Sequence, residues 1–178
     1  MKKKIDVIEH MGEILNGVKN GVLITGKADG RVNSMTICWG MVGVEWGKPV
    51  FITFVRESRF TRSLLEKNGE FTVNTLLDDS AKKILGYCGA KSGRDVDKAK
   101  EIGLTYEEPE TISVPGVKEL PLTLECKVVY KQTQDTEAMT EENREKFYPQ
   151  NVESSFSGAN RDTHIAYYGE IVDAYVIE

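Results

Sequence analysis

The stretch Gly21-Val-Leu-Ile-Thr-Gly-Lys-Ala-Asp-Gly-Arg-Val-Asn-Ser-Met-Thr-Ile-Cys-Trp39 decides the fold class. Residues 21–26 are a largely apolar run, and residues 32–39 alternate between apolar and small polar side chains, as strands do. Between these runs, Asp29-Gly30 is typical of a tight hairpin turn. A further apolar run at 49–55 predicts a buried strand. The chain therefore opens as a β-meander and not as a βαβ unit.

Short helices and more strands are expected after this opening. Helices are predicted within 5–18, and at 60–67, 81–85, 95–102 and near 141–147. Strands are predicted at 70–75, 120–133 and 164–177, residues 104–118 as loop or edge strand, and 134–163 as a polar surface excursion. In the strand at 120–133, Thr123, Glu125 and Lys127 are expected to point outward. The pattern predicts one mainly β domain over 1–178 with short helices, consistent with a closed antiparallel barrel.

The composition is that of an ordinary globular protein. The chain has 178 residues, 40% hydrophobic and 29% charged, with a formal net charge of −5. That balance argues against disorder, and the negative charge argues against binding to nucleic acid or to anionic membranes. No apolar run approaches the ~20 residues that span a bilayer, and the basic start has no apolar core behind it, unlike a signal peptide. We expect a cytoplasmic protein.

Cysteine and histidine are few and scattered. The 3 Cys and 2 His show no close pairing, so the sequence predicts neither a disulfide framework nor a metal site. A nucleophilic pair of Cys88 with His164 is the catalytic alternative, but buried thiols are the favoured interpretation. We expect reduced cysteines and no metal.

Three segments carry chemistry beyond scaffolding. The first is the strand at 33–39, in which Ser34, Thr36 and Cys38 share one face while Met35, Ile37 and Trp39 share the other. Small hydroxyl side chains allow a flat ligand to approach the backbone and form hydrogen bonds. The alternative is a barrel strand with one solvated face, and the pattern alone favours neither.

The second segment, Arg56-Glu-Ser-Arg-Phe-Thr-Arg62, lies where a strand is expected to pass into a helix. A helix start supplies free N–H groups and a favourable dipole, and guanidinium groups bind phosphate in a bidentate manner. In a net-acidic chain this local concentration of arginine favours a phosphate site over a merely solvated surface.

The third segment, Tyr87-Cys-Gly-Ala-Lys-Ser-Gly-Arg-Asp95, combines glycines, a hydroxyl and basic groups. It lacks the order of a nucleotide-binding P-loop, and no GxGxxG marks a Rossmann unit. It is either a basic loop that adds to a phosphate or ribityl pocket, or a flexible surface turn. A flat ring with a phosphate uses both features of the chain, and FMN is such a ligand.

Taken together, these residues resemble the flavin reductase-like family of FMN-binding split barrels, and within it the flavoredoxin branch. The matching stretches are Asn33-Ser-Met-Thr-Ile-Cys-Trp39, Gly47-Lys-Pro-Val-Phe51, Val55-Arg-Glu-Ser-Arg-Phe-Thr61, Glu70-Phe-Thr-Val-Asn74, Tyr87-Cys-Gly-Ala-Lys-Ser-Gly-Arg-Asp95 and Tyr168-Gly-Glu-Ile171. Their order and spacing match over nearly the whole chain. The resemblance implies an antiparallel split β-barrel of the Greek-key type.

The resemblance also implies a homodimer that binds FMN non-covalently near the subunit interface. It assigns the cofactor contacts to four groups of residues: Asn33, Ser34, Met35, Thr36, Ile37 and Cys38 for the ring and ribityl chain; Arg56, Ser58, Arg59 and Thr61 for the phosphate; Asn74 and Thr75 for a further flavin contact; and Ser92, Gly93 and Arg94 from the glycine-containing loop. His164 resembles a position that faces the flavin or a nicotinamide in some relatives.

The implied function is oxidoreduction through the flavin, whose chemistry the protein tunes. Backbone N–H groups near Thr36–Cys38 are expected to donate to N5 and O4 of the ring. Electrons would arrive from NAD(P)H, as in a flavin reductase, or from an iron–sulfur protein, as an electron carrier would receive them. The flavoredoxin resemblance favours electron transfer, and a flavin-binding or storage module without turnover is the alternative.

Overall fold

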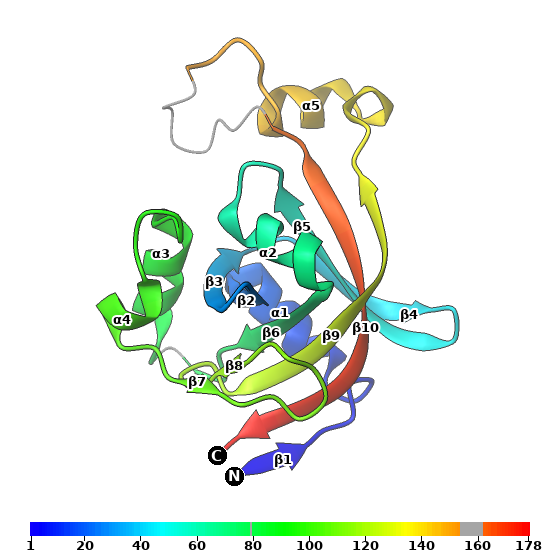
Figure 1. Cartoon of the computed structure of the whole chain (residues 1–178). Coiled ribbons are helices and arrows are strands. Elements are labelled where there is room, and N and C mark those ends of the chain that lie inside the picture. The colour runs from blue at the N-terminus through cyan, green and yellow to red at the C-terminus, as the bar shows by residue number, and fades with distance from the viewer. Residues whose placement is uncertain (79, 154–161) are drawn as a thin grey trace.

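The predicted hairpin is present in the computed structural model, which describes residues 1–78, 80–153 and 162–178. It consists of β2 (Val22–Ala28) and β3 (Arg31–Ile37), which pair antiparallel from Val22 with Ile37 to Ala28 with Arg31 (Figure 1). Asp29 (φ 51°) and Gly30 (φ 73°) both adopt the left-handed conformation that a two-residue hairpin turn requires. The Asp-Gly prediction of the turn is therefore confirmed.

One antiparallel sheet dominates the fold. Its strands follow the order β3-β2-β6-β9-β10-β5-β4, and β1 pairs with β10. The remaining strands of this sheet are β1 (Lys2–Lys4), β4 (Gly40–Glu45), β5 (Lys48–Arg56), β6 (Glu70–Thr75), β9 (Leu122–Thr133) and β10 (His164–Ile177), and a separate ribbon is formed by β7 (Tyr106–Glu107) and β8 (Gly116–Val117). The mainly β class is confirmed. Among the described residues the pairing ends at β3 and β4, so the barrel is open and not closed as expected.

Short helices lie beside the curled sheet, with α3 (Lys82–Ala90) and α4 (Lys98–Ile102) to one side and α5 (Glu141–Phe147) beyond the ends of β9 and β10 (Figure 1). The others are α1 (Met11–Asn20), α2 (Phe60–Asn68) and a 3₁₀ turn at Thr136–Ala138. Each is too short to cross a membrane, as is every helix in the ranges that the structure describes. The helix predicted near 141–147 is confirmed, and residues 154–161 of the expected excursion lie outside the described residues.

The core lies between the curled sheet and α1. Ile14 and Val18 of α1 join the buried side chains of the central strands, among them Phe51 and Phe71, which are fully buried. Gly26 of β2 allows α2 to approach closely, because a Cβ there would lie 3.0 Å from Leu65 Cδ1. This close packing fixes the start of α2 beside β3.

The boundaries of three predicted helices were wrong. The helix expected within 5–18 starts at Met11 and continues past Asn16-Gly17 to Asn20. Gly17 does not end this helix; its missing Cβ leaves room for the side chain of Thr75, which an added Cβ would approach to 2.2 Å. The helix expected at 81–85 extends to Ala90. The helix expected at 95–102 starts only at Lys98, since the Asp97 side chain caps it by accepting from the N–H of Lys100.

The outward alternation expected in β9 was also wrong. Thr123 and Glu125 are fully buried, and only Lys127 is exposed. The loop that includes residues 110–112 covers this face, and the Glu125 carboxylate accepts hydrogen bonds of 2.7, 2.7 and 3.1 Å from three consecutive backbone N–H groups in it. Tyr175 Oη donates to the same carboxylate at 2.8 Å. Glu125 is thus a buried anchor for a loop rather than a solvated side chain.

Candidate functional site

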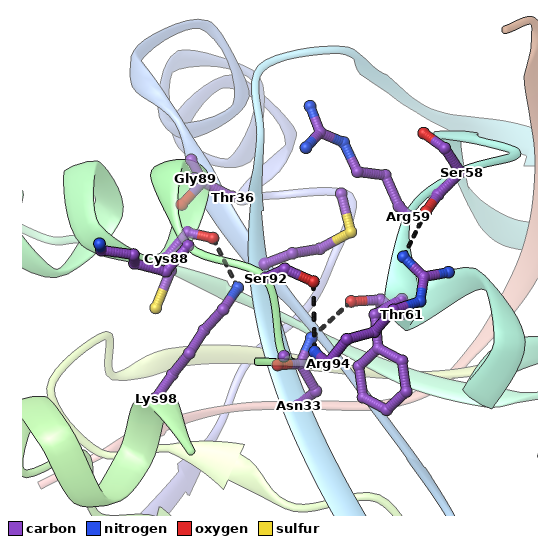
Figure 2. Close-up of a pocket in the computed structure, with 14 residues that line it drawn as sticks. Asn33, Thr36, Ser58, Arg59, Thr61, Cys88, Gly89, Ser92, Arg94 and Lys98 are labelled. Carbon is purple, nitrogen blue, oxygen red and sulfur yellow. Dashed lines mark hydrogen bonds between the residues drawn. The ribbon is translucent and has the colours of Figure 1, made fainter. Parts of the chain in front are cut away.

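Two cavities adjoin at β3 and share Met35, Thr36 and Arg59 in their walls. The first has a volume of about 150 Å³ and lies between β3, the start of α2, the end of α3 and the loop at 91–94 (Figure 2). The second has a volume of about 180 Å³ and is lined by aromatic and basic side chains that include Trp39, Phe54 and His164. A ligand with a charged end and a flat end fits such an arrangement.

Most of the predicted cofactor residues line these two cavities. Asn33, Met35, Thr36, Ser58, Arg59, Thr61, Ser92, Gly93 and Arg94 line the first, and Met35, Thr36, Ile37, Cys38, Arg56, Arg59 and His164 line the second. The structure therefore brings together segments that lie far apart in the sequence.

Three predicted residues lie elsewhere. Ser34 is buried, and its hydroxyl shares a 2.7 Å hydrogen bond with that of Thr25. Asn74 donates to the Leu120 carbonyl at 3.0 Å and to Thr123 Oγ1 at 2.8 Å, and its neighbour Thr75 packs against α1. Their side chains do not line either cavity in the described structure, so the structure does not bring Asn74 and Thr75 to this site.

The backbone of β3 faces the first cavity with its free edge. Lys98 Nζ donates to the carbonyl of Ser34 at 2.9 Å, so the backbone groups of Ser34 point away from β2. The N–H and C=O of one residue point to the same side of an antiparallel strand, and the direction alternates along it. The backbone groups of Thr36 therefore also point to the free edge, where a ligand can accept and donate hydrogen bonds.

The start of α2 provides the basic wall of the first cavity. Arg59 occupies the N-cap position, and no side chain caps the helix there. The first N–H groups of a helix have no partner within the helix and attract anions. The guanidinium of Arg59 is exposed and makes no ion pair or hydrogen bond within the described ranges, so it is available to an anionic ligand.

A network of hydrogen bonds holds the loop at 91–94 against the start of α2. Arg94 Nη1 donates to the Ser58 carbonyl at 2.7 Å, which joins the loop at 91–94 to the start of α2 (Figure 2). Asn33 Nδ2 donates to Thr61 Oγ1 at 2.8 Å. Gly93 has no room for a side chain, because a Cβ would lie 2.1 Å from Asn33 Oδ1. The loop is therefore a packed wall and not a flexible surface turn.

Lys98 is a site residue that sequence reasoning missed. It lines the first cavity although only 3% of it is exposed, and Nζ donates to the carbonyl of Cys88 (Figure 2). The same Nζ also donates to the carbonyl of Ser34. Burial lowers the pKa of its ammonium group. A lysine on a short polar helix gives no sequence signal of burial, because such positions are usually solvated.

Cys88 and His164 line different cavities. Cys88 belongs to the first, where burial raises the pKa of its thiol and so disfavours a nucleophilic thiolate. His164 belongs to the second, where Nδ1 lies 2.7 Å from Tyr148 Oη. The described residues include no cluster of three or more metal-ligating side chains.

The second cavity is bordered by aromatic rings that contact one another edge-on or at a tilt. The Trp39 ring lies 4.8 Å from that of His164 and 5.1 Å from that of Phe147. Burial, together with the charge of Arg56, lowers the pKa of His164 to about 4, so the imidazole is neutral at pH 7. Trp39 is a second residue that our site prediction omitted, although it lies in the decisive strand, because it was assigned to the face opposite the small polar side chains.

Arg56 lines the second cavity and also holds the segments around it together by hydrogen bonds to backbone carbonyls. Its Nη1 and Nη2 donate to the carbonyls of Asp162 and Phe147 at 2.8 and 2.9 Å, and its guanidinium lies over the Tyr148 ring. Arg56 was predicted to hold phosphate. In the structure it joins α5 and the start of β10 to the end of β5.

Comparisons with known proteins show the family of the chain. The model of the flavin reductase like domain matches residues 15–178. An uncharacterized protein of Archaeoglobus fulgidus is 29% identical over 122 residues, which are 68% of this chain and 67% of that protein.

Solved structures give the same result. The flavoredoxin of Methanosarcina acetivorans is 26% identical, with a TM-score of 0.64 over 89% of this chain and 68% of that one. The FMN-binding domain of a flavin reductases-like enzyme from Shewanella baltica is 16% identical, with a TM-score of 0.69 over 99% and 77% of the two chains, and supports the fold alone. The family resemblance noted in the sequence is thus confirmed, and the chain belongs to the flavin reductase-like domain family.

Proposed function

We propose that this protein binds FMN non-covalently at the two cavities and transfers electrons through it. The observation that carries the proposal is Arg59, an exposed cation at the N-cap of α2 whose guanidinium has no hydrogen-bond or ion-pair partner among the described residues. An anion such as phosphate is favoured there by the helix dipole, by free N–H groups and by a bidentate donor. Ser58 and Thr61 add hydroxyl groups to the same wall.

The remaining walls suit the rest of an FMN molecule. From Arg59 the lining continues along the edge of β3 to Trp39 and His164, so a flat ring has aromatic neighbours and backbone partners. The backbone N–H and C=O of Thr36 point to this edge, because those of Ser34, two residues earlier, do so and the direction alternates along the strand. Bound FMN would supply the redox chemistry, and the chain's own residues would hold it, exclude water and orient the molecule that reacts with it.

The first test is whether the purified protein takes up FMN. We expect flavin absorption and a measurable affinity for added FMN, and a lack of uptake would contradict the proposal. Anaerobic addition of NADH, NADPH or reduced ferredoxin then separates the roles. Rapid bleaching by a nicotinamide nucleotide supports a flavin reductase, bleaching by reduced ferredoxin alone supports an electron carrier, and no bleaching by any of them supports a storage module.

A homodimer is proposed from the outer face of the sheet. Met41, Ile52, Tyr168 and Tyr130 are paired in register across β4, β5, β10 and β9, so their side chains lie on one face. Met41 is 55% exposed, and Trp46 beside this row is 58% exposed. Such an apolar row suits a second copy of the chain. Light scattering should give the mass of a dimer, and Met41→Lys should lower it to that of a monomer.

A further inference from the structure

Three side chains connect the residue that follows β9 to the second cavity. Tyr148 Oη lies 2.9 Å from Gln134 Oε1 and 2.7 Å from His164 Nδ1. Tyr148 is 4% exposed and His164 is 7% exposed, so water does not compete for these bonds. The backbone N–H of Gln134 also donates to the His164 carbonyl at 2.9 Å, which holds the two residues in register.

The single O–H proton of Tyr148 determines which group donates in each of these two hydrogen bonds. A carboxamide oxygen only accepts hydrogen bonds, so Tyr148 donates its O–H to Gln134. The Tyr148 oxygen is then an acceptor for the proton on His164 Nδ1. A neutral imidazole carries one proton, and with that proton on Nδ1 the lone pair lies on Nε2.

The neutral state of the ring agrees with the charges around it. Arg56 and Arg59 both disfavour an imidazolium, Asp162 favours it, and burial is the largest influence. The pKa of His164 therefore lies at about 4, well below neutral pH. Protonation would also place a second N–H on a ring whose neighbours include two guanidinium groups.

His164 faces the second cavity beside Trp39. The two rings lie 4.8 Å apart at an angle of 42°, which restricts rotation of the imidazole. In the part of the chain that the structure describes, His164 Nε2 has no hydrogen-bond partner. A buried ring nitrogen with a fixed lone pair at the wall of a cavity is an acceptor for a ligand.

We propose that His164 Nε2 accepts a hydrogen bond from a planar amide-type N–H in the second cavity, and that Tyr148 and Gln134 are positioning residues that fix its tautomer. Two molecules carry this donor: FMN, with the imide N–H of its ring, and a nicotinamide nucleotide, with its carboxamide. The identity of the occupant rests on the proposed function, whereas the tautomer does not.

The tautomer is measured first, by long-range ¹H–¹⁵N NMR of the histidine rings in the protein without ligand. The chain has only 2 His, so His164→Phe assigns both signals, and His10 is the internal control. We expect the proton of His164 on Nδ1 at pH 7. In Tyr148→Phe, whose ring still packs but cannot hydrogen-bond, we expect the proton to move at least in part to Nε2. A proton on Nε2 in the wild-type protein, or no change in Tyr148→Phe, would overturn the proposal.

The ligand that contacts His164 is then identified by adding first FMN and afterwards NADH or NADPH while the ¹⁵N signal of His164 Nε2 is followed. We expect one of the two additions to shift it, and the affinity for that molecule to fall about 3- to 10-fold in His164→Phe, as for the loss of one hydrogen bond. His164→Gln, which places an amide oxygen near the position of Nε2, should recover part of that loss.

Two further outcomes separate this proposal from the proposed function. If the wild-type protein takes up no FMN while the tautomer is as expected, the proposed function fails and the geometry of His164 stands. If FMN binds but neither addition shifts Nε2, the role of His164 as an acceptor is wrong and the proposed function stands.

Discussion

Lys98 Nζ donates to the carbonyl of Ser34 across 2.9 Å, and so connects a buried ammonium group to the free edge of β3. The same nitrogen donates to the Cys88 carbonyl at 2.7 Å. This one side chain therefore joins β3 to the end of α3, and residues of both elements line the first cavity. Its partners are carbonyl oxygens and not carboxylates, so its positive charge is not neutralised by them.

Lys98→Met tests this role. The substitution keeps the apolar stem but leaves two carbonyl groups without their donor, and we expect a loss of about 1–3 kcal/mol in the free energy of unfolding. FMN affinity should fall as well, because the edge of β3 loses its support. Lys100→Met, an exposed lysine on the same helix, is the matched control and should change neither quantity appreciably. Equal effects of the two substitutions in chemical denaturation would contradict the role of Lys98.

Arg59 and Ser58 should carry the binding of phosphate. Charge-assisted hydrogen bonds contribute about 1.5–3 kcal/mol each, so Arg59→Ala combined with Ser58→Ala should weaken FMN binding by a few kcal/mol. Stability should change little, because both residues are exposed. Titration of riboflavin, which lacks the phosphate, should show a much smaller difference between variant and wild type. Unchanged FMN affinity in the double variant would place the phosphate elsewhere.

Gly93→Ala should disturb the site by steric overlap. Its Cβ would lie 2.1 Å from Asn33 Oδ1, and the hydrogen bond from Asn33 to Thr61 would be displaced. We expect lower FMN affinity and a loss of stability of about 1–3 kcal/mol. Gly86→Ala is the matched control, because that helical glycine has no atom within 4 Å of the added Cβ. It should stabilise the protein by about 0.5–1 kcal/mol and leave FMN binding unchanged.

His164 should make stability depend on pH in the acid range. Its pKa is about 4 in the folded protein and close to 6.5 when unfolded, so the unfolded chain binds more protons between these values. The contribution of His164 to the free energy of unfolding is therefore fully present above pH 6.5. It decreases as the pH falls to about 4, by at most roughly 3 kcal/mol.

Urea denaturation at several pH values measures this dependence. Carboxylates titrate in part of the same range, so the informative quantity is the difference between wild type and His164→Phe. The variant should lose less stability between pH 6.5 and 4. Parallel curves for the two proteins would show that His164 does not titrate as described.

Local chemistry was sufficient to predict the hairpin and the segments that meet at the site. Asp29-Gly30 determines its turn by backbone preference alone, and the basic start of α2 is recognisable from arginine and hydroxyl side chains. Glu125 and Lys98 could not be predicted in this way. Each is a charged side chain that looks solvated in sequence, and each is buried because a distant segment covers it and supplies backbone partners.

The same limit explains the positions of Arg56 and Asn74. Their residue types suit a ligand, but the fold supplies partners for both from elements that are remote in sequence. Trp39 shows the reverse case. It was assigned to the face opposite the small polar side chains, yet it lies two residues beyond the end of β3, where the alternation of the strand no longer holds and the ring becomes part of the cavity wall.

The position of β3 at the end of the sheet affects the ligand-free protein, because one edge of this strand is not paired with another strand in the part of the chain that the structure describes. An unpaired strand edge is a template for pairing with other chains, and proteins usually cover or interrupt such edges. In this protein the covering of one stretch of the edge would be left to the cofactor. If FMN binds along this edge as proposed, the ligand-free chain would expose the edge to pairing with other chains, and saturation with FMN would cover it.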